Sequence, residues 1–282
     1  MSSAADLWRE ALARWAIPQE ILDNAPEDPW HFPVQLFASR ADHAGEALTP
    51  SNMRALEALP ERGSVLDVGC GAGAAALALV SKAGRLIGVD SSRDMLDAFL
   101  ERAEAARVNA EVLEGRWPDV AVETPPADVA VCHHVAYNAA DLALFAKRLT
   151  DHARIRVVME LTATHPQSNL NDLWLRFHGI QRPTEPTADD AVAVLREAGL
   201  RPERSNWTSP RRGGFARKED LVAWVRRLLC LPSSRDHEVA EALEGRLTEQ
   251  GGEFGLPDRP VVTLWWPGSA GQEQAQDARR VT

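Results

Sequence analysis

Cysteine is scarce in this chain, and its placement excludes a disulfide framework. The three cysteines, Cys70, Cys132 and Cys230, are odd in number and widely spaced. Neither a set of paired disulfides nor a zinc-binding pattern fits such spacing. Because unpaired cysteines are usual where thiols are kept reduced, we expect a cytoplasmic protein.

Long apolar runs and repeats are also missing. No run of about 20 apolar residues occurs, so we expect no membrane span and no membrane partner. The first residues are polar and include Asp6, Arg9 and Glu10, which predicts that no signal peptide is present. The sequence shows no internal repeat, which excludes a solenoid.

Positive charge is in the minority. The chain of 282 residues has 31 Lys and Arg against 41 Asp and Glu, a net charge of −10. This balance argues against non-specific binding to nucleic acid. Residues 201–227 run the other way, with eight basic and three acidic residues. We expect a solvated face paired with acidic neighbours there, with an anionic acceptor or nucleic acid as the alternative.

What the chain does contain, from residue 64 onward, is an alternation of short apolar segments and helical segments. Continuous apolar segments separated by helices indicate a parallel sheet that is buried on both faces. The expected strands are 64–68, 85–89, 110–113, 128–132, 155–161, 204–208 and 261–266. The expected helices are 74–82, 92–106, 139–149, 169–177, 187–198, 218–229 and 236–247.

We expect three regions along the chain. Residues 1–60 form an N-terminal helical cap, and residues 61–267 form the core. A helical insertion at about 212–258 precedes the last strand of the core. The polar residues 268–282 form a disordered tail. The cap and the insertion are expected to cover the acceptor as a lid.

The segment that carries chemistry runs from Asp67 to Gly73 and reads DVGCGAG. A strand leads there into a glycine turn and then a helix, so a ligand can approach the main chain and the unpaired N–H groups of the helix. The second strand ends at Asp90, whose carboxylate can accept hydrogen bonds from both hydroxyls of an adenosine ribose. The pattern predicts a nucleotide-type ligand.

Two ligands of this type compete for the site. Gly69, Gly71 and Ala74 fit a dinucleotide fingerprint, which is typical of a nicotinamide-dependent oxidoreductase. S-adenosylmethionine is favoured because Asp67 stands where it can face a ligand ammonium and because the glycines run G-x-G-x-G. The chain also ends with two strands split by an insertion, and not with a second mononucleotide-binding half.

The DVGCGAG motif and Val89-Asp90 resemble the first two motifs of class I S-adenosylmethionine-dependent methyltransferases, over about residues 60–210 and the last strand. The resemblance implies an α/β, Rossmann-like fold. Its seven-stranded, mostly parallel sheet has the order 3-2-1-4-5-7-6, with strand 7 antiparallel. The implied cofactor is S-adenosylmethionine, with S-adenosylhomocysteine as the product. The motifs do not identify the acceptor.

The same resemblance implies a set of cofactor-binding residues. Gly69 and Gly71 border the methionine end, and a backbone carbonyl of Cys132 or His133 meets its ammonium. Arg116 stands where relatives often have an acid that binds adenine, so its backbone or stacking by Trp117 takes over that contact. Trp117 and Met95 have core packing as the alternative. The implied set is Arg40, Asp67, Gly69, Cys70, Gly71, Asp90, Ser91, Met95, Gly115, Arg116, Trp117, Cys132 and His133.

Two histidines are candidate general bases. His134 follows the fourth strand, whose end borders the transferred methyl group in the resembling family, and His165 follows the fifth. The alternatives are that His133 and His134 only line the pocket and that His165 is an ordinary loop histidine. We do not expect His133 and His134 to bind a metal, because adjacent side chains on a strand diverge.

Four functions remain open at this point. The leading one is methyl transfer from S-adenosylmethionine to a small-molecule acceptor. The others are an RNA methyltransferase, a non-catalytic cofactor-binding protein and a nicotinamide-dependent oxidoreductase. The missing Asn/Asp-Pro-Pro-aromatic motif after the fourth strand and the acidic net charge speak against the nucleic-acid function. The oligomeric state stays open.

Overall fold

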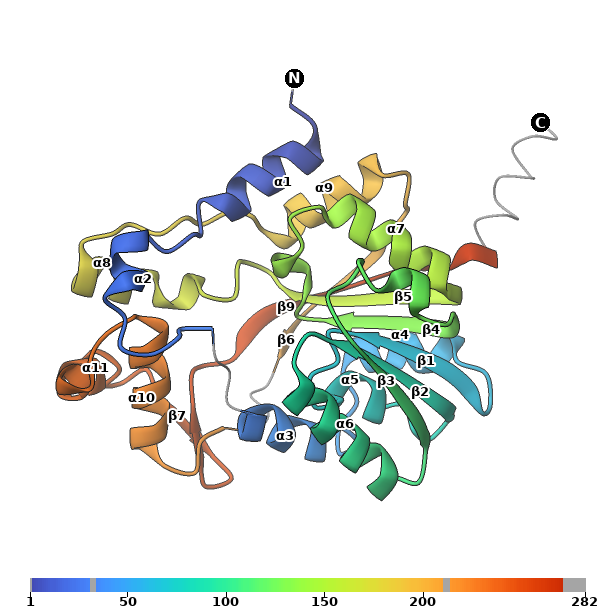
Figure 1. Ribbon diagram of the computed structural model, residues 1–282, viewed down its shortest axis with the longest axis horizontal. Helices are drawn as coiled ribbons and strands as arrows, with labels where there is room; N and C mark the ends of the chain where they lie inside the picture. The colour runs from blue at the N-terminus through green and yellow to red at the C-terminus, as the bar shows by residue number, and fades with distance from the viewer. Residues whose placement is uncertain (1, 31–33, 210–213, 271–282) are drawn as a thin grey trace.

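The computed structural model describes residues 2–30, 34–209 and 214–270, and its centre is a twisted seven-stranded sheet (Figure 1). The strands of the sheet are β1 (Gly63–Val68), β2 (Ala83–Asp90), β3 (Asn109–Glu114), β4 (Ala127–His133), β5 (Ala153–Thr162), β6 (Glu203–Ser209) and β9 (Arg259–Pro267). Their order is β3-β2-β1-β4-β5-β9-β6.

The pairing confirms the expected topology. β1 pairs in parallel with β2 and with β4, and β4 pairs in parallel with β5. β9, the last strand of the chain, lies antiparallel between β5 and β6. The order 3-2-1-4-5-7-6 is therefore correct, with β9 in the place of strand 7. The strand order reverses between β1 and β4. In open parallel sheets, ligands bind at this switch point, beyond the carboxyl ends of the strands.

Helices cover both faces of the sheet (Figure 1). Alternate residues of each strand face opposite sides: Leu66 and Met159 pack with α1, α7 and α9, while Val65 and Val158 pack with α3 to α6. The helices are α1 (Ala4–Ala13), α2 (Gln19–Asp23), α3 (Val34–Asp42), α4 (Pro50–Ala58), α5 (Ala74–Leu77), α6 (Arg93–Ala105), α7 (Leu142–His152), α8 (Asn171–His178), α9 (Ala188–Glu197), α10 (Lys218–Leu228) and α11 (Asp236–Ala242).

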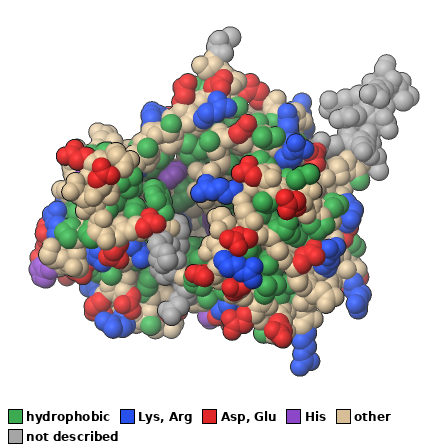
Figure 2. Space-filling model, viewed as in Figure 1, with side chains coloured by type: hydrophobic (Ala, Val, Ile, Leu, Met, Phe, Trp, Pro, Cys, Tyr) green, Lys and Arg blue, Asp and Glu red, His purple; other side chains and the backbone are tan. Residues whose placement is uncertain are grey.

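A separate apolar cluster holds together what we call the outer lobe: α2, α8, α10, α11 and the hairpin of β7 (Thr248–Gln250) and β8 (Glu253–Gly255). Trp174 and Val225 are buried at its centre. Because α8 follows β5 and α10 follows β6, the lobe grows from the carboxyl edge of the sheet. The surface is hollowed between the lobe and the sheet, and a histidine side chain is visible there (Figure 2).

Three helices differ from their expected bounds by three residues or more. The helix expected at 74–82 ends at Leu77, because Ala83 already pairs with Gly63 at the start of β2. The helix expected at 139–149 begins at Leu142, because the Asp141 side chain caps it by accepting the N–H of Leu144. The helix expected at 236–247 ends at Ala242, and the β7–β8 hairpin that follows was not expected.

Three arginines of the basic segment form ion pairs within the chain. Arg204 pairs with Asp189, and Arg217 pairs with Glu219 on α10. Arg226 departs from the expected solvated face, since it is buried and binds Glu27 at 2.7 Å and Asp236 at 2.8 Å. Residues 210–213, which include two more arginines, and residues 271–282 of the expected tail lie outside the described residues.

Candidate active site

The glycine turn joins β1 to α5 and presses against the end of β4. Gly69, Gly71 and Gly73 all have left-handed backbone angles, with φ of +69°, +50° and +96°. A Cβ on Gly69 would lie 2.2 Å from Cγ2 of Val135, so there is no room for a side chain. The turn and the residues that follow β4 therefore form one continuous surface at the carboxyl edge of the sheet.

Asp67 anchors the helix behind this turn. Its Oδ2 accepts the backbone N–H of Ala76 at 3.1 Å, which ties the end of β1 to the first turn of α5. Burial raises the pKa of Asp67 to about 7, opposed by the Ala76 hydrogen bond and increased further by the charge of Asp90. The expected contact of Asp67 with a ligand ammonium stays a prediction.

Asp90 stands at the end of β2, beside the turn. Its two carboxylate oxygens accept the N–H groups of Gly71 and Ser92, both at 2.9 Å. Each carboxylate oxygen has a second lone pair, so the group can still accept two ribose hydroxyls. The acceptor oxygens at this strand end thus fit the ribose of an adenosyl group.

The loop after β3 contains the residues expected near adenine. The N–H of Gly115 donates to the Asp90 carbonyl at 2.9 Å, so the loop lies against β2. Arg116 is exposed. The Trp117 indole donates to the Phe145 carbonyl at 3.2 Å and meets His152 edge-on. These contacts fit the core-packing role that was the alternative to stacking on adenine. Stacking of Trp117 on adenine stays a prediction.

The other expected cofactor residues differ in exposure. Ser91 is exposed, whereas Met95 is buried on α6. The Cys70 and Cys132 side chains are buried, and burial raises the pKa of both thiols. The side chain of Arg40 on α3 lies outside the described part of the structure.

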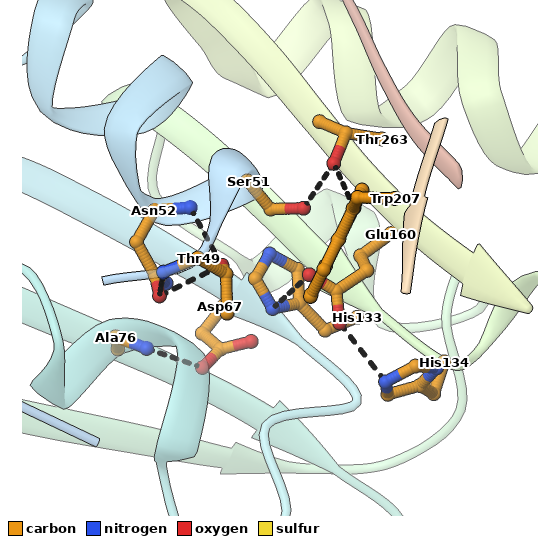
Figure 3. Close-up of polar contacts among 10 residues, drawn as sticks. All are labelled: Thr49, Ser51, Asn52, Asp67, Ala76, His133, His134, Glu160, Trp207 and Thr263. Atoms are coloured by element: carbon orange, nitrogen blue, oxygen red, sulfur yellow. Dashed lines mark hydrogen bonds and ion pairs between the residues drawn. The ribbon is translucent and has the colours of Figure 1, made fainter. Parts of the chain in front are cut away.

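A buried carboxylate joins the two histidines that end β4 (Figure 3). Glu160 lies on β5 opposite His133, and its side chain is 6% exposed. Its Oε1 is 3.0 Å from Nε2 of His134, and its Oε2 is 3.9 Å from Nδ1 of His133. The His134 side chain is 42% exposed, so the pair reaches from the interior to the surface.

Backbone geometry explains how adjacent histidines meet one carboxylate. His134 has a left-handed backbone with φ of +61°, and its N–H donates to the Glu160 carbonyl at 2.7 Å. On a continuing strand, adjacent side chains would point to opposite faces. The expectation that His133 and His134 diverge is therefore wrong. Among the residues that the structure describes, no group of His, Cys, Asp or Glu is placed to hold a metal ion.

The charge of Glu160 is stabilised by its neighbours. Burial alone would raise the pKa of Glu160, but His133, His134 and the Ser51 hydroxyl outweigh it and bring the pKa to about 2. Burial lowers the pKa of His133 in spite of the adjacent carboxylate. At neutral pH the carboxylate is ionised and the His133 imidazole is neutral.

Polar residues of α4 and the neighbouring strands cover this group (Figure 3). Thr263 lies on β9 opposite Glu160, and its hydroxyl is 2.6 Å from the hydroxyl of Ser51 on α4. The Trp207 indole of β6 donates to the same Thr263 oxygen at 3.0 Å. The carboxylate is thus enclosed by strands on both sides and a helix above.

His165 is placed differently from His134. Its ring stacks on Trp15 at 3.8 Å and meets Tyr137 edge-on at 5.3 Å, and its Nδ1 accepts the N–H of Gln167. Burial and the charge of Arg182 lower the pKa of His165 to about 3. At neutral pH the His165 imidazole is therefore neutral and a weak base.

The sequence pattern identifies both histidines of this group as candidates but not Glu160. A signal was present, because Glu160 interrupts the apolar residues 157–161 of a strand that is buried on both faces. A carboxylate in such a strand needs a partner. The histidines at the end of the adjacent strand supply it.

The sheet order, the antiparallel last strand, the glycine turn and the acid at the end of β2 define a class I methyltransferase fold. The comparison with protein families agrees: residues 65–154 match the family described as "Methyltransferase domain". Residues 65–154 thus match a methyltransferase domain, and they lie within a sheet of the class I order.

Solved structures share the fold at low sequence identity. The YcgJ protein from Bacillus subtilis is 19% identical, with a TM-score of 0.51, and the match covers 77% of this chain and 97% of that one. A cyclopropane-fatty-acyl-phospholipid synthase-like protein from Lactobacillus casei is 15% identical, with a TM-score of 0.49 and coverage of 88% and 98%. The search of curated proteins gives no match.

Proposed function

We propose that this chain transfers the methyl group of S-adenosylmethionine to a small-molecule acceptor. The main support is a set of contacts at the carboxyl edge of the sheet, where the cofactor is proposed to bind. Trp15, which follows α1, stacks on His165 after β5 at 3.8 Å. Arg182, which follows α8, donates to the Trp15 carbonyl and to the Ala16 carbonyl. The segment after α1 and the segment after α8 thus contact each other beside the residues that follow β5 at the carboxyl edge.

The cofactor is proposed to lie along the glycine turn. When bound, it supplies a methyl group on a positively charged sulfur. Asp90 accepts the ribose hydroxyls, and the backbone of Gly69 and Gly71 borders the methionine part. Asp67, together with a carbonyl of Cys132 or His133, faces the ammonium. Of the remaining residues, Cys70, Ser91, Met95, Gly115, Arg116 and Trp117 border the adenosine, and Arg40 meets the carboxylate.

The chain's own residues then handle the acceptor. His134, exposed at the end of β4, accepts a proton from the nucleophile. The cap and the outer lobe exclude water and orient the acceptor, which is most of what a protein contributes to an in-line displacement. Among the described helices, none has the length and apolar character needed to cross a membrane.

An RNA methyltransferase is the second candidate. The net charge of −10 and the internal pairing of Arg204, Arg217 and Arg226 both disfavour a polyanionic acceptor. A non-catalytic cofactor-binding protein is the third candidate. It would bind the cofactor but transfer no methyl group to any acceptor.

One experiment separates these functions. The purified protein is incubated with S-adenosylmethionine carrying a tritiated methyl group, and with either a deproteinised metabolite extract or total RNA. We expect enzyme-dependent label in small molecules and none in RNA. Label confined to RNA would contradict the proposal, as would no transfer with either fraction. Calorimetry should show that S-adenosylhomocysteine binds and that NAD does not.

A further inference from the structure

We propose that Glu160 is a positioning residue, which fixes the proton of His134 on Nε2 so that Nδ1 accepts the acceptor's proton, and that the acceptor is a hydroxyl compound. The inference rests on the proposed function, since it assigns the acceptor class of the same site. It concerns a carboxylate and a histidine tautomer that the methyltransferase fold does not itself specify.

Two contacts hold His134 to Glu160. The carboxylate oxygen lies 3.0 Å from Nε2, and the Glu160 carbonyl accepts the backbone N–H of His134 at 2.7 Å. The left-handed backbone at His134 makes both contacts possible at once. Glu160 therefore holds both the backbone N–H and the ring nitrogen Nε2 of His134.

The chemistry of the carboxylate decides the tautomer. An ionised carboxylate only accepts hydrogen bonds, so the His134 nitrogen that faces it must carry the proton. In a neutral imidazole the other nitrogen is then the acceptor. Figure 3 shows this second nitrogen of His134 turned away from Glu160. The lone pair of Nδ1 is thus directed out of the buried polar group.

Glu160 itself has little freedom to move. β5 pairs with β4 on one side and with β9 on the other, so residue 160 is fixed between His133 and Thr263. Its second oxygen is 3.9 Å from His133, longer than a hydrogen bond, and has no hydrogen-bond partner among the described residues. Of the two histidine contacts of the Glu160 carboxylate, only the one to His134 is short enough to orient a ring.

A base fixed in this way indicates which nucleophile it serves. A neutral amine attacks through its lone pair, and a thiol with a pKa of about 8.5 ionises readily in water. An alcohol or a phenol, with a phenol pKa of about 10, needs its proton removed during attack. The acceptor oxygen forms its bond to the methyl carbon while its proton moves to Nδ1, and sulfur keeps the electron pair of the broken bond.

The tautomer can be measured without any acceptor. The chain is labelled with ¹⁵N-histidine, and two-bond ¹⁵N–¹H spectra are recorded at pH 8, with His134→Gln to assign the signals. We expect His134 to carry its proton on Nε2 in the wild type and to be a mixture of tautomers in Glu160→Gln. A wild-type His134 protonated on Nδ1, or an unchanged tautomer in Glu160→Gln, would overturn the positioning role.

Activity provides the second arm. With a tritiated methyl donor and separate panels of phenols, alcohols, amines and thiols, we expect label in the hydroxyl panels alone. Glu160→Gln should lower kcat at least about tenfold and leave the KM for S-adenosylmethionine unchanged. Label in amines or thiols alone would contradict the acceptor class.

An exposed pair on α11 is the matched control. His237 lies 3.7 Å from Glu241, and their side chains are 86% and 56% exposed. Glu241→Gln should leave the His237 tautomer mixture and kcat unchanged. If the spectra show the expected His134 tautomer but no panel is methylated, the proposed function fails while the positioning of His134 by Glu160 stands.

Discussion

Val135 occupies the space in which Gly69 would carry a side chain: a Cβ there would lie 2.2 Å from Cγ2 of Val135. The glycine turn after β1 and the segment after β4 are therefore in direct contact. A side chain at position 69 would have to move Val135, the residue that follows His134.

The first prediction tests this contact. Gly69→Ala should destabilise the protein by about 1–2 kcal/mol from its left-handed backbone and by a further ~1–3 kcal/mol from overpacking. Gly179→Ala is the matched control, because Gly179 has a φ of +67° and nothing within 4 Å of the added Cβ. Urea unfolding measures both variants. If both variants lose the same free energy of unfolding, then Val135 moves aside without destabilising the protein, which would contradict the prediction.

The second prediction concerns the ribose. Asp90→Ala should weaken S-adenosylhomocysteine binding by about 1–3 kcal/mol, because the hydroxyls lose a charged acceptor. Calorimetry on the folded variant measures this. Asp94→Ala, an exposed acid in the first turn of α6, is the control and should bind normally. An unchanged affinity in Asp90→Ala would remove the ribose role.

The third prediction concerns pH and Asp67, whose pKa rises from 3.8 to about 7 on folding. Between these values the folded state binds more protons than the unfolded state, so this residue's contribution to stability decreases as pH rises from about 4 to about 7. Asp67→Asn removes the ionisable group. The free energy of unfolding of Asp67→Asn, relative to that of the wild type, should therefore increase as pH rises from about 4 to about 7. A difference that is independent of pH would contradict the buried, protonated acid.

The fourth prediction compares the two candidate bases. His134→Ala should lower turnover by roughly 10²–10⁴-fold, leave cofactor affinity nearly intact and remove the acidic limb of the pH profile. His165→Ala should keep that limb, because the His165 imidazole, with a pKa of about 3, is already neutral across the assay range. If the limb survives in His134→Ala, that residue only shapes the pocket.

Much of the fold could be predicted from local sequence signals. All seven sheet strands were expected close to their observed positions. A reciprocal cap between Thr187 and Asp190 begins α9 close to the expected start of that helix. The boundaries that were wrong depend on other parts of the chain. α5 ends where β2 begins to pair, and the β7–β8 hairpin depends on contacts such as that of Phe254 with Phe215.

The candidate site was predictable where its residues share one turn. Asp67, Gly69 and Gly71 belong to one strand–turn–helix unit, and Asp90 ends the next strand and accepts the N–H of Gly71. Glu160 could not be placed in the same way, because its partners are set by the pairing of β4 with β5 and by one left-handed residue. Neither feature is visible in local periodicity.

The most direct test is a crystal structure of the protein with S-adenosylhomocysteine. We expect the ribose hydroxyls on Asp90, the sulfur beside the end of β4, and Nδ1 of His134 facing the open space next to the sulfur. A ligand bound away from the glycine turn, or a His134 ring on the side of the sheet opposite the sulfur, would contradict the account.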